Sequence, residues 1–360
     1  MAADSLAFQA EAEEAAPVLL LFGPTASGKT AVLEELFAGP RPLCRAEVIS
    51  ADSMQVYRGM DIGTAKPSKE LLSRLPHHLI DIRDVKEQFN AGEFVRLADA
   101  AARDIFSRGA LPVVSGGTGF YLANFAAGLP ETPPSDQAIR AALREELAEK
   151  GAAALMEELA ARDPVSSGRI HIHDEYRLLR ALEVLRLTGR PLSGFARPGS
   201  PGSLGSLGSL GSLGSLRRTY RFLLAALDRP REEVYRRINQ RCEAMFRAGL
   251  PEEVRRLWEA GCGPDDPGMK AIGYREFFTE DGSETAETSF PPFPPGSFRF
   301  AENTEAVREL VARNSRRYAK RQLTFFKSLP QVHWIPAGRD AAALLGELVE
   351  QKLLSPHSRA

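Results

Sequence analysis

Short apolar runs alternate with helical periodicities along the first part of the chain. Runs rich in strand-forming residues lie at 18–22, 47–50 and 111–114, and apolar residues recur with helical spacing over 94–107. Alternation of strands and helices indicates a parallel sheet with helices on both faces. We therefore predict an α/β fold with a central parallel sheet flanked by helices.

The pattern changes after Pro133 and Pro134, where Ala, Glu, Arg and Leu follow one another with helical spacing over 136–162. A helical pattern continues over 175–188, so we predict an all-helical insertion domain at 131–198. A Gly-Ser-Leu repeat fills 199–216. Repeated Gly and Ser cannot build a core, and we predict a flexible low-complexity loop there.

The core pattern then returns. A strand is predicted at 220–226 and helices at 230–248 and 251–260, with Gly249 and Gly261 as stop signals. Pro, Ser and Thr dominate 281–299, which we interpret as a second loop insertion, and a last long helix is predicted at 302–327. The core thus consists of 17–130 and 217–336.

Composition is typical of a globular protein, with 43% hydrophobic and 26% charged residues among 360. The net charge of −1 means that nucleic acid could bind only through a local basic patch. Cys44, Cys242 and Cys262 have no CxxC spacing, which argues against a disulfide framework or a structural zinc. The acidic N-terminus fits no signal or transit peptide and no apolar run could span a bilayer, so we expect a cytoplasmic protein, monomeric by default.

The first chemical motif is a complete G-x-x-x-x-G-K-T sequence between a predicted strand and a predicted helix. Such a P-loop turns successive backbone N–H groups toward one anion, and the helix N-terminus adds positive potential. The lysine supplies a mobile charge and the threonine hydroxyl can hold Mg²⁺. The sequence therefore predicts a phosphate-type ligand, without its identity, at Gly23, Pro24, Thr25, Ala26, Ser27, Gly28, Lys29 and Thr30.

A carboxylate, Asp52, follows the second predicted strand, at the edge where open α/β sheets bind ligands. It could accept a proton from a nucleophile, although a turn or cap aspartate is the plainer interpretation. An ATPase also needs an apolar strand that ends in Asp. The strand at 111–114 leads into Ser115-Gly116-Gly117-Thr118 instead, and Asp81 is a weak substitute.

Several longer blocks resemble the tRNA dimethylallyltransferase family, in the family's order over about 17–336. They are GPTASGKT, ISADSMQVYRGMDIGTAKP, PHHLIDI, FNAGEF, GGTGFY, RIHIHDEYRLLRALEV, RINQRCEAMFRAGLPEEV, AIGYRE and RRYAKRQLTFF. The resemblance implies a P-loop NTPase-like core. It also implies transfer of a dimethylallyl group from dimethylallyl diphosphate to N6 of adenosine-37, just 3′ of the tRNA anticodon.

The resemblance gives roles to matching residues. Asp52 is expected to be the general base, while Lys29, Thr30, Mg²⁺ and Arg241 hold the diphosphate. Thr118 and Arg140 are expected near the channel where adenine meets the prenyl donor. Contacts with the anticodon stem-loop are expected from Asp52, Ser53, Met54, Gln55, Tyr176, Arg177, Leu178, Leu179, Arg180, Lys270, Gly273, Tyr274, Arg275, Arg316, Arg317, Lys320, Arg321 and Gln322.

The spacing of basic residues supports an RNA surface independently. Arg313, Arg316, Arg317, Lys320 and Arg321 share one face of the last predicted helix, while Val311, Tyr318 and Phe325 lie on another. A cationic stripe suits a phosphate backbone, although a solvated charged face is the alternative.

Three other functions remain open from the residues. A small-molecule P-loop kinase would share the loop and Asp52 but leave the basic helix without a role. An adenylate isopentenyltransferase would not need the helical insertion. A non-catalytic tRNA-binding module would leave the intact loop and Asp52 unexplained. The chain departs from the family pattern at Ile172-His173, and its cysteine count leaves no C-terminal zinc finger, so it resembles the bacterial type.

Overall fold

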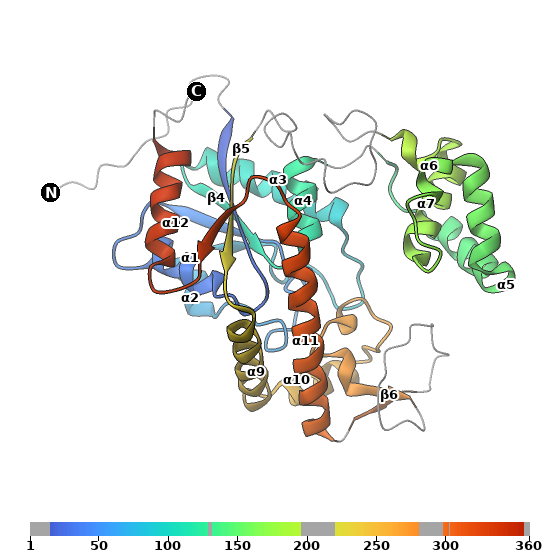
Figure 1. Ribbon diagram of the computed structural model, residues 1–360. Helices are drawn as coiled ribbons and strands as arrows, with labels where there is room; N and C mark the ends of the chain where they lie inside the picture. Colours follow the sequence, from blue (N-terminus) through green and yellow to red (C-terminus); the bar gives the residue numbers. More distant parts are fainter. Residues whose placement is uncertain (1–14, 129–131, 196–219, 281–297, 302, 356–360) are drawn as a thin grey trace. The chain divides into compact units, whose positions relative to one another are not determined.

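The structure is a computed structural model that describes residues 15–128, 132–195, 220–280, 298–301 and 303–355. The chain divides into two compact units (Figure 1). The first, here called the sheet unit, consists of Met1–Phe125 and Thr219–Ala360, and the second, the helical unit, is Ala126–Arg218. The insertion predicted at 131–198 and the Gly-Ser-Leu repeat both fall within the second unit, although the repeat lies outside the described residues.

A six-stranded sheet forms the centre of the sheet unit. Its strands are β1 (Ala16–Phe22), β2 (Ala46–Ser50), β3 (His77–His78), β4 (Leu111–Gly116), β5 (Tyr220–Asp228) and β8 (His333–Pro336), in the order β3-β2-β4-β1-β5-β8. Every neighbouring pair is parallel, which confirms the predicted parallel sheet. Because all strands run the same way, the loops after β1, β2 and β4 leave from one edge.

One face of the sheet packs against α1 (Lys29–Ala38), α2 (Lys69–Arg74) and α12 (Ala341–Val349). Alternate strand residues such as Leu19, Leu21 and Val113 point to this face and join Leu36 and Leu345 in one buried cluster. The period of two along each strand explains why only every second residue takes part.

The other face is covered by α3 (Ala91–Ser107), α4 (Gly119–Ala127) and the long helix α11 (Thr304–Lys327). The Phe125 ring of α4 lies 5.9 Å from that of Phe222 on β5. The Phe326 ring of α11 lies 4.9 Å from that of Phe22, the last residue of β1. This contact attaches the end of α11 directly beside the P-loop.

A separate buried cluster forms beyond the sheet edge. It joins α9 (Arg231–Arg247), α10 (Leu250–Glu259), the 3₁₀ turns Gly268–Lys270 and Arg275–Phe277, and part of α11. Strands β6 (Phe278–Glu280) and β7 (Phe298–Phe300) pair here in antiparallel fashion. The prediction of a loop at 281–299 is therefore wrong at its end, because residues 298 and 299 belong to β7 and pair with β6. Residues 281–297 lie outside the described ranges.

The helical unit contains α5 (Gln137–Arg162), α6 (Pro164–Ser167), α7 (Glu175–Thr188) and the 3₁₀ turn Leu192–Gly194. Leu143, Leu155, Leu178 and Leu182 belong to its own buried core. Helix α5 is interrupted at Gly151, where a φ of 79° takes the backbone out of the helical region.

Sequence reasoning missed the small elements at the edges. It did not anticipate α2 or β3, and it ended the core at 336, before α12 and a π-helical turn at Glu350–Leu354. Strand β8 has only one fully buried residue, Ile335, so its hydrophobic pattern is weak.

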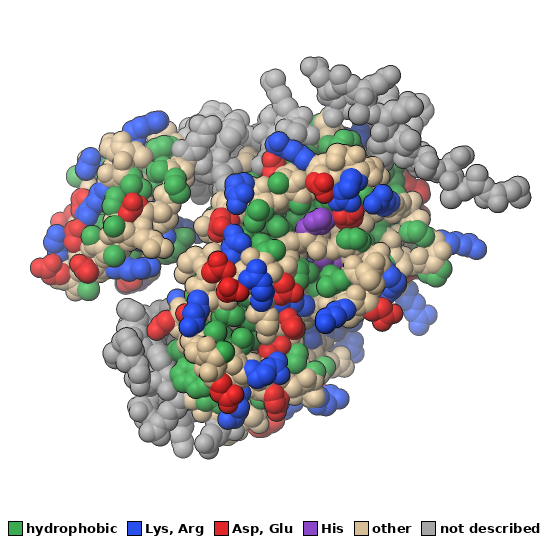
Figure 2. Space-filling view, turned by 180° about the vertical axis from the view of Figure 1, so that it is seen from behind, with side chains coloured by type: hydrophobic (Ala, Val, Ile, Leu, Met, Phe, Trp, Pro, Cys, Tyr) green, Lys and Arg blue, Asp and Glu red, His purple; other side chains and the backbone are tan. Residues whose placement is uncertain are grey.

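In the part of the chain that the structure describes, we find no helix with the length and apolar character needed to cross a bilayer. On the face shown in Figure 2, acidic and basic side chains are interspersed over the surface. This mixture agrees with the net charge of −1.

The contact between Phe326 and Phe22 gives a first prediction. Replacing the fully buried Phe326 with Ala (Phe326→Ala) leaves a cavity against the sheet, so the free energy of unfolding should fall by about 3–5 kcal/mol in denaturant titrations. Lys327→Ala, at the exposed neighbour, should change it by less than about 0.5 kcal/mol. Equal losses in both variants would contradict this account of how α11 is attached.

Candidate active site

The P-loop connects β1 to α1 at the carboxyl edge of the sheet. Gly28 has a φ of 103°, a conformation that side chains disfavour, and it leads directly into Lys29. Lys29 folds back over the loop, where its Nζ donates to the carbonyl oxygens of Gly23 at 2.8 Å and Pro24 at 3.2 Å. These two bonds hold the lysine ammonium beside the first residues of the P-loop.

Two arginines hold the same loop from the β5–α9 side. Nε of Arg237 donates to the carbonyl oxygen of Ala26 at 2.8 Å, and Nε of Arg229 donates to that of Ser27 at 3.2 Å. An anion would meet the loop N–H groups nearest the N-terminus of α1, because those of Thr25 and Ser27 already donate to Gln322 and to the carbonyl oxygen of Pro24.

Gln322 on α11 joins the P-loop to the turn after β4. Its Oε1 accepts from the backbone N–H of Thr25 at 2.8 Å, and its Nε2 donates to the carbonyl oxygen of Gly117 at 2.7 Å. The side chain is 6% exposed. Gln322 therefore holds the two loops together and also lines the cavity, so its predicted contact with tRNA stays a prediction, limited to a nucleotide that enters the cavity.

Asp52 lies just after β2, as predicted. Its Oδ1 accepts from the backbone N–H groups of Met54 at 2.9 Å and Gln55 at 3.3 Å, which fixes the carboxylate in a turn. Oδ2 has no hydrogen bond to any described residue. The side chain thus serves as a turn former and also presents a free oxygen to the cavity that it lines.

The turn after β4 packs against the Asp52 segment. Thr118 donates its backbone N–H to the carbonyl oxygen of Ala51 at 3.1 Å, and its Oγ1 accepts from the backbone N–H of Ser53 at 3.1 Å. Gly116 approaches the backbone of Ala51 so closely that a Cβ could not fit. The structure therefore brings Thr118 and Asp52 together.

These segments surround one cavity of about 580 Å³. Its charged lining holds six cationic side chains and a single carboxylate, Asp52. The cations are Lys29, Arg237, Arg241, Lys270, Arg275 and Arg321. So large an excess of positive charge selects an anionic ligand.

Burial of these charged side chains strengthens the positive electrostatic potential in the cavity. It lowers the pKa of Lys29 to about 8, an effect that nearby Asp52 opposes and Arg241 reinforces. Burial also lowers the pKa of Arg241, whose Nε has no hydrogen-bond partner among the described residues. Burial and the Asp52 charge raise the pKa of Tyr318 to about 12, so its hydroxyl stays protonated. A dianionic or trianionic ligand would relieve the repulsion between the two cations.

Magnesium can be assessed from the side chains present. The described residues contain no cluster of three or more His, Cys, Asp or Glu side chains that could hold a metal ion. Thr30 and Asp52 nevertheless both line the cavity. Because Mg²⁺ usually keeps several waters and binds through one or two protein groups plus substrate phosphates, this sparse donor set fits an ion that arrives with a diphosphate.

Some predicted RNA contacts prove to be core residues. Tyr274 is fully buried and its hydroxyl donates to Glu253 at 2.6 Å. Leu178 and Leu179 are 0% and 6% exposed in the core of the helical unit. Their side chains have no surface to offer a polynucleotide, so the predictions of tRNA contact at these three positions are corrected.

Other predicted contacts occupy different environments. Gly273 donates its backbone N–H to Glu276 at 2.8 Å. On α11, Arg317, Lys320 and Arg321 are exposed, whereas Arg316 donates to Asn239 at 2.6 Å.

In the helical unit, Tyr176 is exposed beneath the guanidinium of Arg140, which lies 4.9 Å from the ring centroid. Arg177 pairs with Asp174, while Arg180 pairs with buried Glu183 and donates to the carbonyl oxygen of Pro133. Arg140 belongs to the helical unit and Thr118 to the sheet unit, so their shared place beside one channel stays a prediction.

Sequence reasoning missed Arg229, Arg237 and Tyr318 as site residues. Arg237 lies one helical turn before Arg241, which is a usable signal, but surface arginines with this spacing are common. Tyr318 was placed only on a helix face away from the basic residues, with no role in a site, and its side chain lines the cavity.

The fold and this site together define a P-loop α/β protein that binds a phosphate-bearing ligand beside one carboxylate. Comparison with known proteins makes the class specific. A family model described as IPP transferase matches residues 55–329. The chain belongs to the IPP transferase family.

Similar proteins agree with this assignment. A tRNA dimethylallyltransferase from Geobacter sulfurreducens is 41% identical over 330 residues, which is 91% of this chain and 95% of the relative. The solved tRNA isopentenylpyrophosphate transferase of Bacillus halodurans is 31% identical, with a TM-score of 0.59 and coverage of 94% of this chain and 97% of that one. A eukaryotic dimethylallyltransferase acting on tRNA, at 21% identity and a TM-score of 0.67, covers 94% of this chain and 80% of its own, and supports the fold.

The lowered pKa of Lys29 gives a second prediction. Above about pH 8 the free protein loses this proton, so binding of a diphosphate ester should weaken by up to about tenfold per pH unit. Calorimetric titrations between roughly pH 7 and pH 10 would measure this slope, because the diphosphate is ionised throughout.

Lys29→Met is the matched control for this titration. The variant should bind more weakly at every pH, and its profile should be flatter because the titrating group is gone. Parallel profiles for the two proteins would show that another group controls the pH dependence.

Proposed function

We propose that this chain transfers a dimethylallyl group from dimethylallyl diphosphate to N6 of adenosine-37 in tRNA, giving N6-isopentenyladenosine and diphosphate. The observation that carries the proposal is the cationic cavity with a single carboxylate at its P-loop edge. Relatives named tRNA dimethylallyltransferase support tRNA as the acceptor and a dimethylallyl group as the group transferred.

The reaction needs a site for departing negative charge and a base for the nucleophile. N6 of the adenine attacks C1 of the dimethylallyl group, and the bond between C1 and the diphosphate oxygen breaks. Lys29, Arg241 and the P-loop N–H groups stabilise the diphosphate as it gains charge. The free Oδ2 of Asp52 receives the proton that N6 loses.

Thr30 is the protein group best suited to hold Mg²⁺ beside the diphosphate, with Asp52 within the same cavity. A bound Mg²⁺ would neutralise charge on the leaving diphosphate oxygens. The residues of the chain then have to keep water away from the dimethylallyl group and to orient N6 of the adenine. A site inside a cavity suits both tasks.

Adenosine-37 must leave its stack in the anticodon loop to reach this cavity. Extraction of a base from a single-stranded loop costs less than extraction from a duplex. The exposed cations Arg317, Lys320 and Arg321 could hold the RNA backbone while the base is extracted.

We further propose that the protein acts as a monomer in the cytoplasm.

Acceptor choice tests the proposal against its rivals. Purified protein, Mg²⁺ and labelled dimethylallyl diphosphate should be incubated with either total tRNA or AMP. We expect label in tRNA and none in AMP. Label in AMP would indicate an adenylate isopentenyltransferase, and no label in either, with ATP-dependent turnover of small metabolites, would indicate a kinase.

Replacement of Asp52 tests the assignment of the base. Asp52→Asn keeps an oxygen for the Met54 and Gln55 N–H groups but removes the basic carboxylate. The single-turnover transfer rate should fall by about 10²- to 10⁴-fold while tRNA affinity stays within a few-fold.

Asp84→Asn makes the same chemical change at a side chain that is 71% exposed, in the loop between β3 and α3, where it pairs with Arg58. Its transfer rate should match that of the unaltered protein. An Asp52→Asn rate within a few-fold of that rate would exclude Asp52 as the base.

A further inference from the structure

One wall of the cavity has no regular secondary structure. Residues Asp52–Gln55 and Gly63–Ala65 both line it, and they belong to the segment between β2 and α2, where there is no helix or strand. The shape of this wall therefore depends on side-chain hydrogen bonds.

Glu253 of α10 holds the far end of this segment. Its carboxylate is 2% exposed and accepts from three successive backbone N–H groups: Asp61 at 2.9 Å, Ile62 at 2.9 Å and Gly63 at 3.1 Å. Successive N–H groups that converge on one anion form a nest, a rigid arrangement of backbone. Here the anion comes from the protein itself.

A fourth donor to the same carboxylate is a side chain. The hydroxyl of Tyr274 donates to Oε1 of Glu253 at 2.6 Å, and the buried tyrosine ring packs so closely on Gly63 that a Cβ would not fit there. Glu253, Tyr274 and Gly63 thus form one interlocked unit behind the cavity wall.

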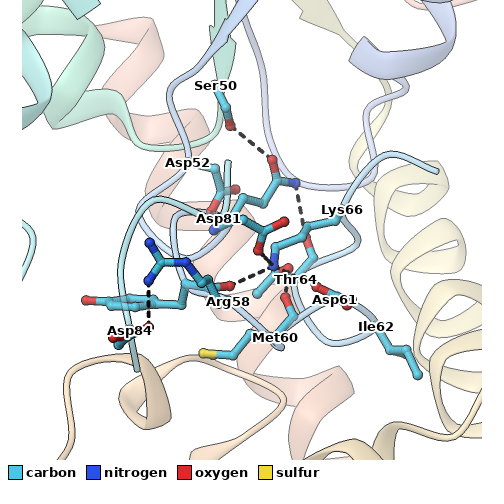
Figure 3. A network of polar contacts seen from close by, with 12 residues as sticks. Ser50, Asp52, Arg58, Met60, Asp61, Ile62, Thr64, Lys66, Asp81 and Asp84 are labelled. Atoms are coloured by element: carbon cyan, nitrogen blue, oxygen red, sulfur yellow. Dashed lines mark hydrogen bonds and ion pairs between the residues drawn. The ribbon is translucent and has the colours of Figure 1, made fainter. Parts of the chain in front are cut away.

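Gln55 connects this unit to Asp52. Its Nε2 donates to the carbonyl oxygens of Thr64 at 3.2 Å and Ala65 at 3.3 Å. Its Oε1 accepts from Oγ of Ser50 at 3.0 Å, the bond that leaves the labelled Ser50 in Figure 3. Its backbone N–H donates to Oδ1 of Asp52. A displacement of the backbone at 61–65 would therefore also move the Asp52 carboxylate, through its connection to Gln55.

Lys66 binds the same part of the segment. The side chain is 6% exposed, and Nζ donates to the carbonyl oxygen of Tyr57 at 2.6 Å and to Asp61 at 2.7 Å, with Asp81 as a third partner (Figure 3). The backbone at 61–66 is thus held by buried Glu253 and by Lys66, whose own partners Asp61 and Asp81 are exposed.

We propose that Glu253 is a positioning residue for prenyl transfer: by holding the backbone at 61–63 it fixes the cavity wall and, through Gln55, the orientation of Asp52. Glu253 does not line the cavity, so it acts without contact to either substrate. This inference rests on the transfer reaction proposed above. It assigns to Glu253 a function in acceptor activation that is separate from diphosphate binding.

The test is Glu253→Gln, which keeps the size of the side chain but sets an NH₂ group against the N–H donors. The transfer kcat should fall by about 10- to 100-fold, because a displacement of about 1 Å at a reacting group has this effect. The KM for dimethylallyl diphosphate should change by less than about twofold, since the P-loop makes no hydrogen bond to this unit.

Glu252→Gln is the matched control, because the neighbouring glutamate on α10 is exposed. It makes the same charge change on the same helix and should leave both constants unaltered. Tyr274→Phe keeps the buried ring and removes one donor to Glu253, so its kcat should lie between those of the unaltered protein and Glu253→Gln.

Hydrogen exchange distinguishes positioning from general stability. In Glu253→Gln, amide exchange should accelerate in the segment 52–66 and stay unchanged in α9 and α11. Acceleration throughout the sheet unit, or an unchanged kcat with faster loop exchange, would overturn the proposal.

The proposed function and this inference fail in different ways. If the unaltered protein transfers no label to tRNA, the function is wrong. If it does transfer label, and Glu253→Gln loses kcat and diphosphate affinity in equal measure, the positioning role is wrong.

Discussion

Concentration of positive charge around one carboxylate, at one edge of a parallel sheet, is the constraint on which the rest of the structure depends. Six cationic side chains and Asp52 line a single cavity in a chain whose net charge is −1. Like charges repel and lose hydration when they are brought together, so such a site persists only if the surrounding fold holds it. Hydrogen bonds from Lys29, Arg229 and Arg237 to loop carbonyls meet part of this need.

The supporting contacts come from distant parts of the chain. Gln322 joins the P-loop to the Gly117 turn, and the buried carboxylate of Glu276 accepts from Gly273 and Asn314. Prenyl transfer needs few reacting groups, because a stabilised leaving group and one base suffice. Most of what the protein contributes is therefore the placement of these groups, which explains why buried polar residues around the cavity hydrogen-bond its walls together.

The sequence predicted the parts of the site that local patterns encode. A P-loop lies between its own strand and helix, and Asp52 follows a strand whose direction is set by the parallel sheet. The sequence did not predict that Gln322 would be buried against Thr25, 297 residues away, because helical periodicity does not reveal which polar side chain on α11 turns inward. Nor could polarity or aromatic character show that Tyr274 is a core residue whose hydroxyl is bound by Glu253.

The central claim is that the P-loop of this chain holds the diphosphate of a prenyl donor and does not hydrolyse a nucleotide. Calorimetric titration with dimethylallyl diphosphate and with ATP, each with Mg²⁺, tests it most directly when combined with an assay for phosphate release. The account predicts saturable binding of dimethylallyl diphosphate, weakened by Arg241→Ala, and no hydrolysis of ATP with or without tRNA. Tight ATP binding with turnover, and no binding of dimethylallyl diphosphate, would contradict it.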